Sequence, residues 1–174
     1  RRDVGVAHNM VANIKSAKGV SPALKMFDDG LNIGLGTDGP MSGNTLDIIG
    51  QMGYVAKLHK LVNKDRSAMP PYKVVEMATM GGARAINRED ELGSLEPGKL
   101  ADVVVVETTS TNMQPMFDPY SVLVYSANAS NVDTVIVNGK IVVSGKTLLT
   151  QDEEKNRAAV KAFSKKVEAI AETL

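Results

Sequence analysis

The stretch Leu31-Asn-Ile-Gly-Leu-Gly-Thr-Asp38 is a short apolar run that ends in an aspartate, and a glycine and a proline follow it. Ile33 and Leu35 alternate with small residues, and the run is too short for a helix, so it predicts a buried strand. Asp38 would then lie at the carboxyl end of that strand, which is where parallel α/β barrels place their catalytic residues. The alternative is that Asp38 caps a helix beginning near Asn44.

The composition is that of an ordinary globular protein, with 43% hydrophobic residues, 23% charged residues and no net charge. This balance excludes the charge footprint of a protein that binds nucleic acid or a membrane surface. The chain has no cysteine, so disulfides and thiolate metal sites are excluded. It has no apolar run of membrane-spanning length and opens without a signal peptide or a methionine. We therefore expect a cytoplasmic protein, cut from something longer.

The first ninety residues alternate between strand and helix patterns. A strand, a helix and a second strand within about 35 residues predict a βαβ unit with a parallel sheet and a right-handed crossover. Ser21 and Pro22 mark the start of the first helix, as N-cap and first helical residue. We expect strands over 4–8 and 31–38, a loop over 10–19, and helices over 21–30, 44–62, 72–80 and 83–86.

From Leu92 onward the pattern becomes that of a small β domain, followed by one helix. Asn138-Gly139 is a strong hairpin signal, and the β-branched run Val103–Val106 predicts a buried strand. We expect strands over 103–106, 121–126, 132–137 and 140–144. Beyond Gln151, a stripe of apolar residues at helical spacing predicts an amphipathic helix; its members are Val160, Phe163, Val167 and Ile170.

Several motifs together resemble the metal-dependent amidohydrolase superfamily, over the chain up to about Val143. The stretch from Leu92 to Asp102, Leu-Gly-Ser-Leu-Glu-Pro-Gly-Lys-Leu-Ala-Asp, is highly specific for it. Gly-Thr-Asp-Gly with Ser42 and Asn44 is similar to the branch of methylthioadenosine/S-adenosylhomocysteine deaminases and triazine hydrolases. The other matching motifs are His8-Asn9, Ser42 to Asp47, and Gly81-Gly-Ala-Arg-Ala85.

The resemblance implies an α/β fold in which a distorted (β/α)8 TIM-like barrel lies beside a small β-sandwich built from both ends of the chain. Residues 1–91 would hold the last strands and helices of the barrel. Residues 92–150 would form the C-terminal part of the composite sandwich, and residues 151–174 a C-terminal helix.

The resemblance also implies a role for Asp38 as metal ligand and as the group that handles protons for an attacking hydroxide. A divalent metal lowers the pKa of bound water, and a carboxylate can pass the proton to a leaving amine. We expect zinc, with iron as the alternative. Ser42 matches a position close to the substrate. His8 and Asn13 match positions that either line the pocket or hold its loop, and both roles stay open.

The sequence lacks the other metal ligands of the family, namely the His-x-His motif and the later histidines, and its proton-shuttling glutamate. Asp38 is thus one ligand of a site that needs three or four. The parent protein would hydrolyse non-peptide C–N bonds, deaminating a nucleoside, purine or related N-heterocycle, with triazine-type dehalogenation as an alternative. This chain alone could instead be a catalytically silent fragment, a homo-oligomer or an assembly partner that needs its missing N-terminal part.

Several other residues have ordinary structural interpretations. His59 lies between Leu58 and Lys60 and is expected on an exposed helix face. Asn44 is expected to be an N-cap, and Asp47 to lie in the first turn of the same helix. Asp102 is expected to make turn hydrogen bonds.

Overall fold

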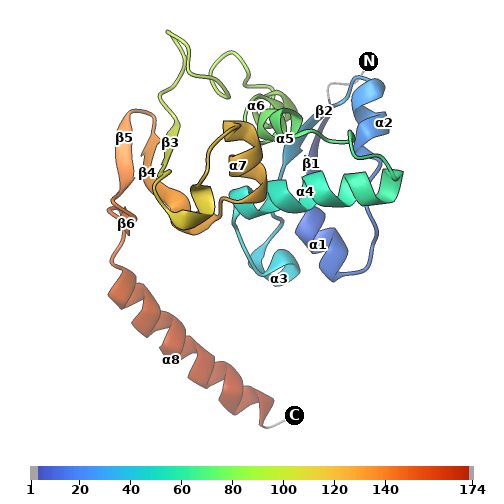
Figure 1. The fold of residues 1–174 in the computed structure, drawn as a ribbon. Helices are drawn as coiled ribbons and strands as arrows, with labels where there is room; N and C mark the ends of the chain where they lie inside the picture. Colours follow the sequence, from blue (N-terminus) through green and yellow to red (C-terminus); the bar gives the residue numbers. More distant parts are fainter. Residues whose placement is uncertain (1–3, 173–174) are drawn as a thin grey trace.

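The computed structural model describes residues 4–172 and shows an α/β body, an antiparallel sheet beside it and a projecting helix (Figure 1). In the body, β1 (Gly5–His8) and β2 (Asn32–Leu35) pair in parallel, with His8 opposite Leu35. The chain between them forms α1 (Met10–Lys15) and α2 (Ala23–Asp28). The βαβ unit is therefore present, but the loop expected over residues 10–19 was wrong in its first part, which is α1.

Helices α4 (Ile48–Asn63), α5 (Pro71–Ala78) and α6 (Met80–Ala85) pack against the parallel pair. The core between them is rich in methionine, an unbranched side chain that fills irregular gaps. Its larger buried members are Met10, Ile33, Met52, Val55, Met69, Val74, Met77 and Val124. Ile33 of β2 lies in this core, and the partly buried Leu35 at the end of the strand packs against it.

Helix α6 approaches the strands closely because glycines meet at the contact. A Cβ atom on Gly34 of β2 would lie 2.7 Å from the Cα of Gly82, which is closer than real Cβ contacts. A Cβ atom on Gly81 would lie 2.5 Å from the carbonyl oxygen of Ile33. The Gly81-Gly82 pair thus lets the helix backbone rest directly on the strand.

The strand expected over residues 121–126 was wrong, because this segment is helix α7 (Pro119–Tyr125). Asp118 caps the helix, accepting hydrogen bonds from the backbone N–H groups of Tyr120 and Ser121 at 3.3 and 3.1 Å. Proline at the first helical position suits this start. Val124 is buried in the core, where α7 packs against α4 and α5. Tertiary burial and the cap outweigh the β-branched composition.

Asn44 was also wrongly expected to cap α4. It follows the short helix α3 (Pro40–Gly43) and has left-handed backbone geometry, with φ of 61°. The N-cap of α4 is Asp47, whose Oδ1 accepts a hydrogen bond from Gly50 N at 3.0 Å. Two helices of the body, α4 and α7, therefore begin at an aspartate cap, Asp47 and Asp118 respectively.

The antiparallel sheet of the described chain runs in the order β3 (Val103–Val106), β4 (Val132–Val137), β5 (Lys140–Ser144) and β6 (Thr147–Leu148). The expected hairpin joins β4 to β5, and Asn138 and Gly139 both have positive φ, 48° and 76°. Asp102 accepts a hydrogen bond from Asn138 N at 2.7 Å, which confirms its turn role.

Two short helical turns, η1 (Thr111–Met113) and η2 (Ala129–Asn131), connect the sheet to α7. Asn131 is buried and donates from Nδ2 to Glu107 Oε1 at 2.7 Å. Hydrogen bonds from Ser110 and Asn131 lower the pKa of Glu107 to about 2. The ionised carboxylate thus holds this connection together.

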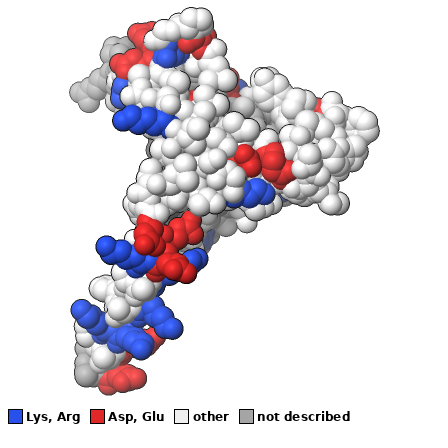
Figure 2. Space-filling view, turned by 90° about the vertical axis from the view of Figure 1, so that its left-hand side faces the viewer, with Lys and Arg blue, Asp and Glu red and all other residues white. Residues whose placement is uncertain are grey.

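Helix α8 (Glu153–Ala171) confirms the expected C-terminal helix and projects away from the rest of the molecule (Figure 1). Its described residues include none that is buried, and the members of its apolar stripe are 48–67% exposed. Lys and Arg side chains gather along it (Figure 2). Within residues 4–172, no helix combines the length and apolar character that crossing a membrane requires.

Candidate metal and substrate site

Asp38 lies just beyond the carboxyl end of β2, as expected, in a left-handed backbone conformation with φ of 58°. Its exposed carboxylate accepts a hydrogen bond from Gly39 N at 2.6 Å. This bond, then the Ser42 hydroxyl and the charge of Lys18, lower the pKa of Asp38. The alternative role as a helix cap was wrong, because Gly39 precedes α3 and Asp47 caps α4. The carboxylate is therefore ionised at neutral pH, and no helix cap occupies it.

A cavity of about 200 Å³ brings three of the expected site residues together: Asp38, Ser42 and Asn13. Asp38 and Ser42 come from the segment after β2, and Asn13 comes from α1, which follows β1. Because the carboxyl ends of parallel strands meet at one edge, the two segments face each other there. The remaining lining residues are Ala12, Lys15, Ser16, Lys18 and Met41.

Lys15 and Lys18 line this cavity but were not predicted as site residues. Lys15 ends α1, and its Nζ donates to the carbonyl oxygen of Met41 at 2.9 Å. The signal that could have found them is their position, since both belong to the segment between β1 and α2, which leaves β1 at the edge where β2 also ends. The pocket wall is therefore basic opposite the Asp38 carboxylate.

His8 is not among the residues that line this cavity, because its side chain is only 2% exposed. Its Nε2 lies 3.1 Å from the Nε2 of His59, and its Nδ1 lies 3.0 Å from the hydroxyl oxygen of Ser21. Both ring nitrogens thus have partners within the fold. These contacts support the structural one of the two roles left open for His8.

His59 was wrongly expected to be exposed, since it is 1% exposed and faces the core. Burial and the neighbouring His59 lower the pKa of His8 to about 4, and burial lowers the pKa of His59. Both rings are therefore neutral at pH 7. In a neutral pair, one Nε2 carries the proton and donates a hydrogen bond to the other Nε2.

The described residues do not by themselves form a metal site. Among residues 4–172, no group of three or more His, Cys, Asp or Glu side chains could hold a metal ion. A protein zinc site has three or four such ligands, and here Asp38 is the single ligand that the motifs predicted. The donor set of the described residues therefore does not fit a metal on its own.

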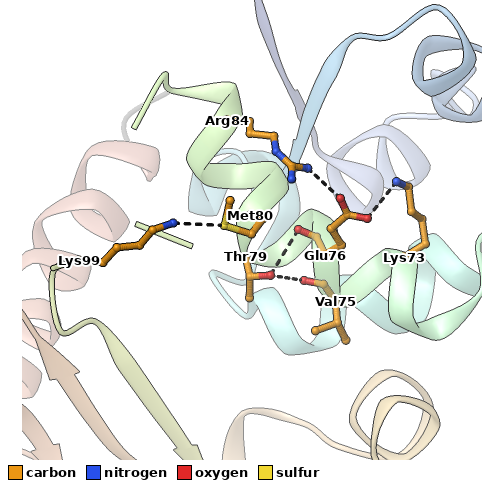
Figure 3. A network of polar contacts seen from close by, with 7 residues as sticks. All are labelled: Lys73, Val75, Glu76, Thr79, Met80, Arg84 and Lys99. Atoms are coloured by element: carbon orange, nitrogen blue, oxygen red, sulfur yellow. Dashed lines mark hydrogen bonds and ion pairs between the residues drawn. The ribbon is translucent and has the colours of Figure 1, made fainter. Parts of the chain in front are cut away.

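A different polar cluster lies at the start of β2, around Glu76 of α5 (Figure 3). Arg84 Nη1 and Lys73 Nζ lie 2.8 and 3.0 Å from the two carboxylate oxygens of Glu76. These two contacts, with that of Arg84 the larger, lower the pKa of Glu76. Lys73 also lies 4.6 Å from the ring centroid of Phe27. The cluster ties α5, α6 and α2 together and has a structural role.

Comparisons with known proteins bear on this site. A 5-methylthioadenosine/S-adenosylhomocysteine deaminase from Desulforudis audaxviator is 45% identical over 154 residues, which is 88% of this chain and 36% of that protein. A 5'-deoxyadenosine deaminase from Methanosarcina acetivorans is 43% identical over 89% of this chain and 35% of its own length.

Solved structures of similar fold include a deaminase and a chlorohydrolase. An adenosine deaminase from Xanthomonas campestris with bound zinc superposes with a TM-score of 0.92 and 32% identity, over 95% of this chain and 38% of that one. An atrazine chlorohydrolase from Arthrobacter aurescens with zinc superposes with a TM-score of 0.82 and 26% identity, over 92% of this chain and 36% of that one.

The chain thus spans little more than a third of the length of these relatives. The amidohydrolase family model matches residues 1–142, which include both strands of the parallel pair, the Asp38 pocket and most of the antiparallel sheet. The resemblance inferred from the motifs is therefore confirmed, and the chain belongs to the amidohydrolase family.

Proposed function

We propose that this chain is the C-terminal part of a metal-dependent hydrolase that deaminates a nucleoside, purine or related nitrogen heterocycle. One observation carries the proposal. Asp38 lies just beyond the carboxyl end of a parallel strand, in a pocket with Ser42, and the chain superposes on a zinc-bound adenosine deaminase. In this proposal residues 1–91 complete a barrel, residues 92–150 complete a sandwich, and the rest of the parent protein supplies the other ligands of a zinc ion.

Each pocket residue of this chain has a distinct role in the proposal. Asp38 is one metal ligand and also accepts the proton of the attacking water, passing it to the leaving amine. Its lowered pKa suits the first task, since the carboxylate is already ionised at neutral pH. Ser42 donates to that carboxylate and lies where a substrate would contact it, and Asn13 holds the opposite wall.

Two alternatives remain distinct from deamination. Dehalogenation of a triazine is favoured by the atrazine chlorohydrolase neighbour, but that protein is 26% identical whereas the named deaminase is 45% identical. A catalytically silent fragment is favoured by the single candidate ligand in the described residues. A two-stranded parallel pair with open outer edges supports a chain that joins further strands from its parent.

The test is a chimaera in which the N-terminal part of the Desulforudis audaxviator deaminase, up to where the match begins, is joined to this chain. We expect zinc-dependent release of ammonia from methylthioadenosine. Asp38→Asn should lower turnover by about 10²- to 10⁴-fold, the range for a lost proton-transfer group, with the fold retained. Asp65→Asn is the matched control, since Asp65 is another exposed aspartate with a hydrogen-bonded, lowered pKa.

Near-normal turnover in the Asp38→Asn chimaera would remove the catalytic role from Asp38. A folded, zinc-loaded chimaera that releases no ammonia would contradict the deaminase proposal. Release of chloride from a chlorotriazine in place of ammonia would favour the dehalogenase alternative.

A further inference from the structure

Lys15 connects the two segments that carry the pocket residues. It is the last residue of α1, after β1, and its Nζ donates to the carbonyl oxygen of Met41 in α3, after β2. The backbone hydrogen bonds of α3 use the carbonyls of Gly39 and Pro40, so the Met41 carbonyl lies beyond them. A cation at the C-terminal end of a helix is a favourable partner for such a carbonyl.

The segment that Lys15 holds has few other hydrogen bonds to the rest of the molecule, although α3 packs against α1 and its Gly43 is buried. Within residues 4–172, the other hydrogen bonds given for residues 38–44 are local to that segment and its immediate neighbours. Asp38 and Asn44, at its two ends, both have left-handed backbone geometry. Aspartate and asparagine adopt this conformation more readily than other residues with a side chain, so the geometry does not by itself tie the segment to the body.

We propose that Lys15 is a positioning residue, which fixes α3 so that Ser42 and Asp38 keep their orientation in the pocket. The consequence for catalysis rests on the proposed function. The positional effect itself does not, because it concerns only contacts within this chain. Ser42 follows Met41 directly and donates to the Asp38 carboxylate, so a displaced α3 moves both groups together.

The competing explanation is that Lys15 binds an anionic group of the substrate. Lys18 offers the matched control, because it lines the same cavity and its charge acts on Asp38. Among the described contacts, however, its Nζ makes no hydrogen bond to α3. If Lys15 has a positioning role, replacing Lys15 should disturb α3 and replacing Lys18 should not. If both lysines act only through their charge, the two replacements should have similar effects.

The first experiment measures hydrogen–deuterium exchange in the purified 174-residue chain. Lys15→Met should speed exchange of the amides of Ser42, Gly43 and Asn44 by about fivefold, the factor expected from loss of one such hydrogen bond. Lys15→Arg should restore the original rates, and Lys18→Met should leave them unchanged. Unchanged rates in Lys15→Met would overturn the proposal, as would equal acceleration in Lys18→Met.

The second experiment uses the chimaera with an uncharged substrate, methylthioadenosine, and a carboxylate-bearing one, S-adenosylhomocysteine. Lys15→Met should lower kcat/KM by about fivefold or more for both substrates, and Lys15→Arg should restore it. A loss confined to the carboxylate-bearing substrate would overturn positioning in favour of direct binding. If the wild-type chimaera is inactive, the proposed function fails, while the exchange rates still decide the role of Lys15.

Discussion

The buried pair of His8 and His59 should make the chain less stable in weakly acidic solution. These are its only two histidines, and histidine is the side chain whose ordinary pKa lies between pH 5 and 8. In the folded chain the pKa of His8 is about 4, against 6.5 for the exposed group. Because the unfolded chain binds the proton more readily, stability falls as the pH falls below 6.5.

The magnitude follows from the linkage between protonation and folding. The difference between 6.5 and about 4 corresponds to about 3 kcal/mol, all of it lost below pH 4. At pH 5 the loss relative to pH 8 is about 2 kcal/mol. The pKa of His59 is also lowered by burial, so its titration acts in the same direction. Protonating both rings would place two cations with nitrogens 3.1 Å apart.

The assay is urea unfolding between pH 8 and pH 5, followed by tyrosine fluorescence. The four tyrosines suit it, because Tyr54 lies in α4, Tyr72 in α5, and Tyr120 and Tyr125 in α7. We expect the free energy of unfolding to fall by about 2 kcal/mol over this range. Carboxylates titrate at lower pH and contribute little here.

The control is the variant carrying both His8→Gln and His59→Gln, which has no histidine left to titrate. Its free energy of unfolding should be nearly constant from pH 8 to pH 5, although lower in absolute value. The reasoning is refuted if the wild-type chain is equally stable at both pH values. It is also refuted if the double variant loses as much stability as the wild type.

Three further perturbations have defined outcomes. Gly34→Ala should lower the free energy of unfolding by about 1–3 kcal/mol, because the new Cβ meets the Gly82 backbone. Gly39→Ala is the control, because nothing lies within 4 Å of a Cβ there, and an equal loss of stability in both variants would contradict this reasoning. The purified chain should contain no stoichiometric zinc by elemental analysis; one equivalent that disappears in Asp38→Ala would show that a site assembles from this chain alone. Deleting residues 152–174 should leave the urea midpoint by tyrosine fluorescence unchanged, since α8 buries none of its described residues, and a clear drop would reveal a contact with the body.

Where local sequence determines geometry, the sequence was sufficient to predict the structure. The apolar run before Asp38 is a strand because alternating aliphatic and small residues suit a buried position. Asn138-Gly139 forms the hairpin because both residues tolerate positive φ. The apolar stripe of α8 gives a helix because its spacing follows the helical period.

Where tertiary contacts decide, the sequence was less informative. The segment 121–126 contains two β-branched valines, yet it is helical because Asp118 caps it and Val124 reaches the core. An aspartate followed by proline was the available signal. His59 was judged by its sequence neighbours, whereas Met52 and Val55 stand seven and four positions earlier on the same buried helix face.

Sequence motifs led to some residues of the candidate site and missed others. Asp38, Ser42 and Asn13 share one cavity, whereas the buried His8 does not line it, and the roles expected for them in metal and substrate binding stay predictions. Lys15 and Lys18 were missed because the segment after β1 was expected to be a loop, which gives no direction to its side chains. The remaining metal ligands could not be predicted, since the chain carries only two histidines and both are paired with each other.

The projecting helix α8 and the body of this chain should lose their structure in different ways. Its 19 residues rely on their own backbone hydrogen bonds and the Asp152 cap, and an isolated helix of that length is marginal in water. On heating, α8 should fray gradually and without a calorimetric peak, before the methionine-rich core melts in a single step. Ellipticity and tyrosine fluorescence should then report different melting curves for one and the same polypeptide.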